Sequence, residues 1–320
     1  LLSNNLYDVQ HIKPQDPILP PESDVMLWMQ PRRNSTPVID LLSAHLQQGK
    51  NSIVALQHFN IQQRQYRGNG FQTVYWPQPQ FQDFDRFSQL YGVEQVREVL
   101  FDRTQSHLDL ETQVNRTAVR EYDAQQVALP FLIRAVAPNY RRQSALTRHL
   151  GDLLFIWGNR FALDRQRLAE IGMDAQVLIS TSERSWAYAW SGGWLPPDVF
   201  SSSDYLQGTQ PLAVQLTGPF DRARFSEDAE GRSQIKLGEK AQDAGQLLLV
   251  GSSEMFKNEY LYAAGFQHDQ FLLNAVAHMA YGEALAELQA RRPVSRGFAF
   301  QNPQAKSAWR AVSIGLAPLL

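Results

Sequence analysis

Apolar positions follow two different patterns in the first sixty residues of the chain: unbroken runs and helical spacing. Residues 24–29 form an almost unbroken apolar run, which predicts a short buried strand. Apolar residues then recur at helical spacing, with Ser35 as a candidate N-cap and Gly49 after the last turn. Residues 52–56 are the next apolar run. The pattern therefore predicts a β-α-β unit, whose crossover should be right-handed.

Two polar stretches interrupt this rhythm. Residues 59–82 are polar and contain glycine, and the segment Trp76-Pro77-Gln78-Pro79 cannot belong to a regular helix. We expect a long exposed excursion there, with a hairpin turn at Asn69-Gly70. Residues 221–240 are rich in charge and predict a second excursion.

The rest of the chain alternates apolar runs with helical patterns. Further strands are expected at residues 99–102, 127–133, 153–157, 175–180, 211–216 and 246–251. Helices are expected at residues 83–91 and from Asp269 to Gly282. This order predicts a single α/β domain over residues 1–310. It would be built on a mostly parallel, doubly wound sheet, with insertions near residues 59–82 and 221–240.

Composition narrows the classes of function. The chain has 320 residues, no cysteine and a net charge of −2. The lack of cysteine excludes disulfides, thiolate nucleophiles and cysteine-ligated metals. The near-neutral charge argues against bulk binding to nucleic acid, so we expect no nucleic-acid partner. Neither the Gly-x-Gly-x-x-Gly pattern nor a P-loop occurs, and no cofactor is expected.

Ser252 and Ser253 follow the last apolar run, at a strand end where α/β proteins place nucleophiles. A Gly-x-Ser-x-Gly elbow is absent, because no second glycine follows. One interpretation is an α/β hydrolase that uses either serine with a remote histidine such as His268. The other interpretation is a turn that caps a helix.

Trp186, Trp190 and Trp194 lie close together in the sequence, beside Gly192-Gly193. Such an aromatic cluster can form the floor of a groove that binds a carbohydrate or a peptide. It can equally be part of the core together with a packing loop. The groove hypothesis requires exposed rings on one concave face.

Metal-ligating and acid–base patterns are weak. The seven histidines contain no His-x-x-x-His or similar pair, so no metal site is expected. Asp83 and Asp85 form a pair of acids in a polar segment, where solvated charge is the default interpretation.

The last thirty residues differ in character from the rest. Residues 288–320 contain no acid, and residues 312–320 are mostly apolar. This pattern fits either a buried C-terminal strand or the start of a truncated membrane segment at residues 311–320. Beside a membrane, the cations of this region would meet anionic headgroups. They are Arg291, Arg292, Arg296, Lys306 and Arg310.

Several short motifs follow one another in a fixed order along the chain. They are Leu6-Tyr7-Asp8-Val9, the segment from Asp24 to Pro31, the helix ending at Gly49, Leu90-Tyr91-Gly92-Val93 with the strand ending at Asp102, Thr181-Ser182 with Ser185-Trp186, Pro211-Leu212-Ala213-Val214, Gly251-Ser252-Ser253, and Asn274. In order and spacing they resemble the extracytoplasmic domain of GldG-type auxiliary components of ABC transporters, a family named for gliding motility.

The chain departs from this family at several positions. Gln57-His58 stand where the family has an aspartate, and so do Ser253 and Glu254 after the last strand. Gly49-Lys50 stand where the family has a double glycine. The fold is similar to flavodoxin-like and glutamine-amidotransferase-like proteins, but amidotransferase chemistry needs a cysteine, which this chain lacks. The resemblance therefore implies a binding role and not an enzyme.

The resemblance implies a non-catalytic auxiliary domain that contacts the permease or the transported substrate of a membrane-anchored ABC transport system. Its partners would be the permease and the ATP-binding subunits. Anchors outside this sequence would hold it at the inner membrane, facing the periplasm. Lys306 and Arg310 favour the cytoplasmic side, because cations beside a membrane helix tend to stay there. The candidate contact residues are Trp186, Trp190, Trp194, Ser252 and Ser253.

Overall fold

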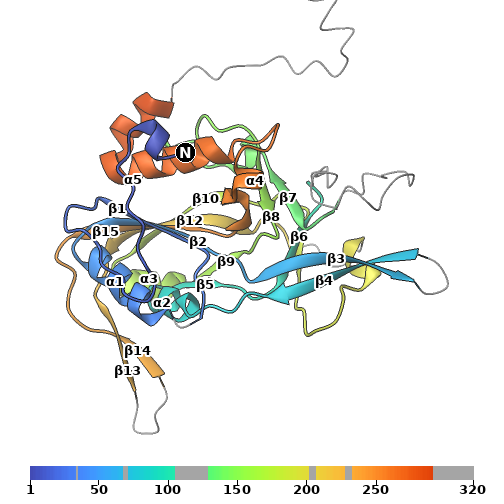
Figure 1. The fold of residues 1–320 in the computed structure, drawn as a ribbon, viewed down its shortest axis with the longest axis horizontal. Coiled ribbons are helices and arrows are strands. Elements are labelled where there is room, and N and C mark those ends of the chain that lie inside the picture. The colour runs from blue at the N-terminus through green and yellow to red at the C-terminus, as the bar shows by residue number, and fades with distance from the viewer. Residues whose placement is uncertain (34, 68–70, 105–128, 202–206, 228–232, 291–320) are drawn as a thin grey trace, which may run out of the picture. The chain divides into compact units, whose positions relative to one another are not determined.

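The computed structural model describes residues 1–33, 35–67, 71–104, 129–201, 207–227 and 233–290. These residues belong to one unit, Leu1–Ala290, which is built around a five-stranded sheet with the strand order β1-β2-β15-β12-β10 (Figure 1). The five strands are β1 (Val25–Met29), β2 (Asn51–Ala55), β15 (Ala244–Val250), β12 (Pro211–Pro219) and β10 (Asp174–Ser180).

The sheet is mixed. β1, β2 and β15 are parallel neighbours, whereas β12 runs antiparallel to both β15 and β10. The sheet therefore differs from the mostly parallel, flavodoxin-like sheet that the sequence pattern predicts. The reason lies in the connection from β12 to β15. The last residue of β12, Pro219, pairs with the first residue of β15, Ala244, so the connection starts and finishes at the same end of the sheet. A parallel neighbour would need a crossover instead.

Helices cover both faces of the sheet. α1 (Thr36–Gln47) packs on one face and α5 (His268–Ala290) on the other (Figure 1). The alternation along β2 explains this arrangement, because Ile53 and Ala55 belong to the cluster on the α5 side, and Val54 belongs to the cluster with α1. The other α-helices of the described residues are α2 (Phe84–Leu90), α3 (Arg165–Glu170) and α4 (Asn258–Leu261).

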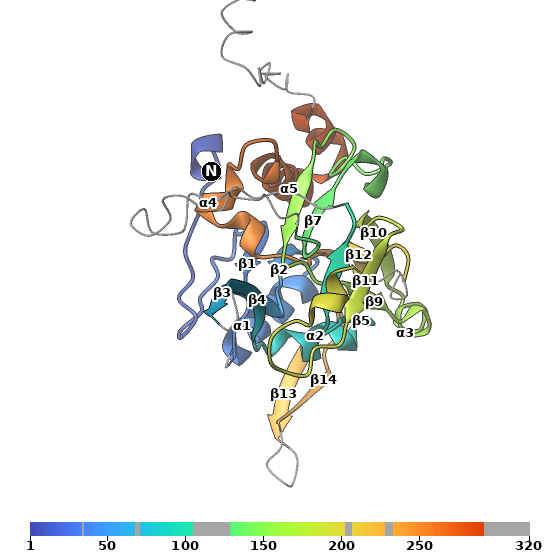
Figure 2. The same ribbon diagram turned by 90° about the vertical axis from the view of Figure 1, so that its right-hand side faces the viewer.

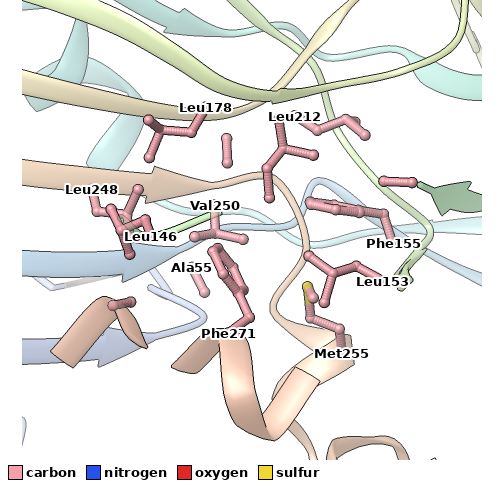
Figure 3. Packing of buried hydrophobic residues seen from close by; sticks show 14 of the residues in the cluster. Ala55, Leu146, Leu153, Phe155, Leu178, Leu212, Leu248, Val250, Met255 and Phe271 are labelled. Carbon is pink, nitrogen blue, oxygen red and sulfur yellow. The ribbon is translucent and has the colours of Figure 1, made fainter. Parts of the chain in front are cut away.

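The cluster on the α5 side is shown in Figure 3. Phe271 of α5 points at Ala55 of β2 and Val250 of β15, and all three side chains are fully buried or nearly so. Met255 and Leu153 close the same cluster at the carboxyl end of β15. The burial of such apolar area supplies the main favourable free energy of folding.

The predicted β-α-β unit is confirmed at β1, α1 and β2. α1 begins after Ser35 with a proline in its first turn and ends just before Gly49, whose φ is +78°. The Ser35 hydroxyl does not cap the helix; it donates to the main-chain carbonyl of Arg32. α5 contains a break at Gly282, with a φ of 78°, where the sequence predicts the helix to end.

Both predicted excursions form hairpins. β3 (Phe59–Arg67) pairs with β4 (Phe71–Pro79), and β13 (Ala223–Glu227) pairs with β14 (Ser233–Leu237). Both hairpins project from the body of the unit (Figures 1 and 2). The prolines of β4 are tolerated because a two-stranded hairpin leaves one edge of each strand unpaired. The predicted turn at Asn69-Gly70 lies outside the described residues.

Three short antiparallel pairs complete the described fold. They are β5 (Val93–Gln95) with β9 (Phe161–Leu163), β6 (Val99–Asp102) with β11 (Ser185–Tyr188), and β7 (Leu132–Ala135) with β8 (Leu153–Ile156). The membrane segment predicted at residues 311–320 and the cations from Arg291 to Arg310 lie outside the described residues.

Candidate functional site

The two candidate serines lie directly after β15. The hydroxyl of Ser252 is buried and donates to the main-chain carbonyl of Ile156 at 2.8 Å. The hydroxyl of Ser253 lies 3.4 Å from Oε1 of Gln57. Both hydroxyls therefore help to hold the turn after β15 against β8 and β2. Among the described residues, neither hydroxyl reaches a histidine.

His268 is occupied by main-chain groups on both sides of its ring. Its Nδ1 donates to the carbonyl of Tyr260 at 2.8 Å, and its Nε2 accepts the amide hydrogen of Leu154 at 2.9 Å. Burial lowers the pKa of this imidazole. A ring with both nitrogens engaged has no free atom to accept a proton from a serine. The structure thus does not assemble the pairing of Ser252 or Ser253 with His268 that the hydrolase hypothesis needs.

Trp186 is part of the core. Its side chain is 1% exposed, its Nε1 donates to the carbonyl of Val199 at 2.8 Å, and its ring stacks on Phe101 with centroids 5.4 Å apart. A buried indole with a satisfied N–H is the arrangement expected for a packing residue. Trp186 is therefore closed to a ligand in this structure.

Trp190 and Trp194 are placed differently from Trp186. Trp190 is half-buried, with its ring edge-on to Phe59 at 5.5 Å, and its Nε1 donates to the carbonyl of Gly193. Trp194 is 48% exposed. The three tryptophans consequently do not present their rings on one exposed face, as the groove hypothesis requires.

The ends of the parallel strands bring a different set of polar residues together. The carboxyl ends of β1, β2 and β15 meet at one edge of the sheet because these strands are parallel. We call the residues that follow them, 30–33, 56–58 and 251–254, the carboxyl edge. Open α/β sheets bind ligands at the carboxyl ends of their strands. This edge is therefore the place in the fold where a functional site is expected.

Gln57 and Glu254 form the buried part of the carboxyl edge. Oε1 of Gln57 accepts the amide hydrogen of Glu254 at 3.2 Å, and its Nε2 donates to the carbonyl of Phe59. The Glu254 side chain is only 4% exposed and pairs through Oε1 with the Lys257 ammonium at 2.5 Å. Its Oε2 is buried without a hydrogen-bond partner among the described residues. Ordered water satisfies such an atom in many proteins.

His58 and Asp85 lie beside this buried part. Nε2 of His58 donates to the carbonyl of Gln95 at 2.9 Å and lies 3.6 Å from Oδ2 of Asp85. Burial, with a smaller contribution from Arg97, lowers the pKa of His58 to about 4. Burial raises the pKa of Asp85 to about 7, against the opposing effect of Arg97. Because the two pKa values are reversed, His58 and Asp85 are not charged together at any pH, and their contact is not an ion pair.

A surface patch of cations lies next to Asp85. Phe81 follows β4 and is 43% exposed. The guanidinium carbon of Arg33 lies 3.9 Å from the centre of its ring, and that of Arg97 lies 4.7 Å away. Arg32 donates to the side-chain carbonyl of Gln80 at 2.7 Å. We call Arg32, Arg33, Phe81 and Arg97 the Phe81 patch.

Sequence reasoning missed both the Phe81 patch and the unusual environment of Asp85. The patch joins residues that follow β1, β4 and β5, so no short motif contains it. Asp85 is 27% exposed and faces His58, so it is not the solvated acid that its polar neighbours suggested. The nearest signal in the sequence is the polar pair Gln57-His58, which directly follows the apolar run of residues 52–56.

Other features offer less chemistry. A cleft of about 510 Å³ lies between α2, α3 and the base of the β13–β14 hairpin. Its charges pair with one another: Lys240 with Asp221 at 2.7 Å, and Arg167 with Glu170 at 3.7 Å. Within the described ranges, no group of three histidine, aspartate or glutamate side chains could hold a metal ion. None of the described helices combines the length and apolar character needed to cross a bilayer.

Comparison with known families assigns the chain to a class of transport proteins. Residues 2–275 match a family described as "ABC-type uncharacterized transport system". Its members are auxiliary components of such systems. Because the match spans nearly the whole chain, the chain belongs to this family. It is thus an auxiliary component of an ABC-type transport system. No curated protein matches the chain significantly.

Proposed function

We propose that this chain is the non-catalytic, extracytoplasmic part of a membrane-anchored ABC transport system of the GldG type. Family membership supports the transport role. The observation that carries the non-catalytic role is the engagement of Ser252 and His268, which hold main-chain groups at the sheet edge where a nucleophile would be needed. The chain would act by contacting the permease or the transported substrate.

Replacement of the two serines tests the non-catalytic role. Ser252→Ala removes one buried hydrogen bond and should cost about 1 kcal/mol of folding free energy. Ser253→Ala should cost less, because its hydroxyl makes only a contact of 3.4 Å. Neither variant should lower transport in cells by more than about twofold. A loss of tenfold or more in a variant that still folds, shown by circular dichroism, would contradict the proposal.

Labelling of a single engineered cysteine tests the location. The chain has no cysteine of its own, so Ser191→Cys on an exposed loop and Ser307→Cys give unambiguous sites. A membrane-impermeant maleimide should label both sites in cells whose inner membrane is intact. Labelling only after disruption of the inner membrane would place the chain in the cytoplasm. A cysteine introduced into the ATP-binding subunit serves as the cytoplasmic control.

Co-purification tests the partners. An affinity-tagged chain, extracted in mild detergent, should retain the permease and ATP-binding subunits encoded with it. Recovery of the chain alone, with both subunits present in the extract, would contradict a role as a stable component.

A further inference from the structure

The Phe81 patch concentrates positive charge at the carboxyl edge. Arg33 and Arg97 both lie over the Phe81 ring, at 3.9 Å and 4.7 Å from its centre, so their guanidinium carbons are at most 8.6 Å apart. All three arginines of the patch are exposed. Like charges held near each other repel, and a bound anion relieves that repulsion. The patch is thus arranged to receive a negative group.

Among the described residues, no carboxylate lies within ion-pair distance of Arg32, Arg33 or Arg97, although Arg97 acts electrostatically on Asp85. Arginines elsewhere do have one: Arg134 pairs with Asp152 and Arg160 pairs with Glu98. No such ion pair forms at Arg33 or Arg97. The acids near the patch have other partners, because Asp83 accepts the amide hydrogen of Ser35 and Asp85 accepts from Gln82.

The patch is held in place by the surrounding fold. The main-chain amide of Gln80 donates to the main-chain carbonyl of His58 at 2.6 Å, which fixes the segment before Phe81 against the end of β2. Arg32 and Gln30 both donate to Oε1 of Gln80, so the end of β1 is tied to the same segment. A surface that is ordered before binding loses less conformational entropy when it binds.

The chemistry of the patch suits carboxylates. A guanidinium stacked on an aromatic ring keeps its N–H groups free at its rim, where they can bind a carboxylate with two parallel hydrogen bonds. The exposed ring adds apolar contact area. Asp83, Glu94 and Arg97 all act electrostatically on Asp85, so acidic groups lie on the Arg97 side of the patch and disfavour a broad anionic surface such as a bilayer. A short acidic segment can instead place single carboxylates on Arg33 and Arg97.

We propose that the Phe81 patch binds an acidic peptide segment of a partner subunit in the transport system, with Arg33 and Arg97 holding its carboxylates. The inference rests on the proposed function, which requires such partners. Phe81 contributes by positioning the two guanidiniums and by covering the apolar part of the segment.

The first test uses the purified chain and a fluorescein-labelled hexaglutamate peptide, with binding followed by fluorescence anisotropy at low salt. Arg33→Gln/Arg97→Gln should weaken binding about tenfold or more, and Phe81→Leu roughly threefold. Arg141→Gln/Arg142→Gln removes the same charge from an exposed loop elsewhere and should change binding less than twofold. Equal effects of the two double variants would overturn the proposal. Displacement of the peptide by inorganic phosphate at a lower concentration than by glutarate would overturn the assignment to carboxylates.

The second test uses the full-length protein with its transporter subunits. The Arg33→Gln/Arg97→Gln variant should lose most of the co-purifying subunits, whereas Arg141→Gln/Arg142→Gln should retain them. Equal retention by the wild type and both variants would overturn the role of the patch and leave the proposed function standing. Absence of subunits from the wild type would overturn the proposed function itself.

Discussion

At the scale of single residues, Asp85 shows how packing changes the chemistry of a side chain. Burial raises the pKa of its carboxyl group to about 7, although Arg97 acts in the opposite direction. In the unfolded chain the same group has an ordinary pKa near 4. The folded protein therefore binds more protons than the unfolded chain between about pH 4 and pH 7, and Asp85 reduces stability as the pH rises through this range.

Asp85→Asn should stabilise the protein at pH 7.5 by about 1–2 kcal/mol, because asparagine resembles the protonated carboxyl group and pays no cost for a buried charge. We expect a gain smaller than the free energy that corresponds to the whole pKa shift, because the side chain is 27% exposed and water screens its charge. Urea unfolding at pH 7.5 and pH 5 measures the effect. The gain should shrink at pH 5, where the wild-type carboxyl group is already protonated.

Glu94→Gln is the control for this prediction, since Glu94 is an exposed acid in the same neighbourhood. It removes one negative charge without removing a buried one and should change stability by less than about 0.5 kcal/mol. Equal stabilisation by both variants would show that net charge, and not burial, governs the site.

At the scale of elements, the end of β15 depends on a close approach between backbones. Gly251 accepts the amide hydrogen of Asn159 at 2.6 Å and donates to the carbonyl of Leu212 at 2.8 Å. A Cβ at position 251 would lie 2.2 Å from the Asn159 carbonyl oxygen and 3.0 Å from that of Leu212. Only glycine fits between these two backbone groups, so the turn that bears Ser252 and Ser253 depends on it.

Gly251→Ala should destabilise the protein by more than about 2 kcal/mol, because backbone atoms must move to admit the methyl group. Gly238→Ala is the matched control: its nearest contact would be 3.4 Å, and its φ is not positive. The control should shift stability by less than about 1 kcal/mol in the same urea titration. Similar midpoints for the two variants would contradict the role of close approach.

Local patterns predicted some elements well and others poorly. β1, α1 and β2 were predictable because apolar runs, a proline in the first turn and Gly49 all act within a few residues. A hairpin in the first excursion was expected from Asn69-Gly70, and β3 and β4 do pair. The strands of the β13–β14 hairpin were missed because their polar side chains give no buried face to recognise. The antiparallel direction of β12 depends on how the long connection from β12 to β15 folds. The residues of β12 alone do not encode it.

In the candidate site, too, local features could be predicted and long-range contacts could not. Ser252 and Ser253 were correctly placed after a strand, but the acceptors of their hydroxyls come from β8 and from the segment after β2, far away in the sequence. The convergence of Arg33 and Arg97 on Phe81 is equally non-local. A single sequence does not reveal such contacts, because each residue taken alone has the pattern of an ordinary surface position.

At the scale of the whole molecule, the lowered pKa values of three of the buried histidines predict how stability responds to acid. Burial lowers the pKa of His45 and of His58 to about 4, and lowers that of His268 as well. In the unfolded chain these imidazoles titrate near 6.5. The unfolded chain therefore binds more protons than the folded protein below pH 6.5, and stability is lost as the pH falls through this window.

The free energy of unfolding should fall between pH 6.5 and pH 4, by about 1–3 kcal/mol for each of His45 and His58, since one pKa unit corresponds to about 1.4 kcal/mol. His268 adds to the fall in the same direction. Asp85 opposes this fall, so Asp85→Asn should make it steeper. His45→Gln should make it shallower, whereas His149→Gln, at an exposed position, should leave it unchanged. Urea titrations across the range provide the measurement, and a flat profile would refute the assignment.

One contact has a mechanical consequence. The ring of Tyr7 stacks on that of Tyr281 in α5, with centroids 6.2 Å apart, so two positions far apart in the sequence lie side by side. A pulling force applied between these positions would act first on the N-terminal segment and α5, whose contacts would break one after another. The paired strands β2 and β15 lie outside that line of tension. They would experience shear only after the outer layer had peeled away, so the sheet and its carboxyl edge should keep their shape under moderate force.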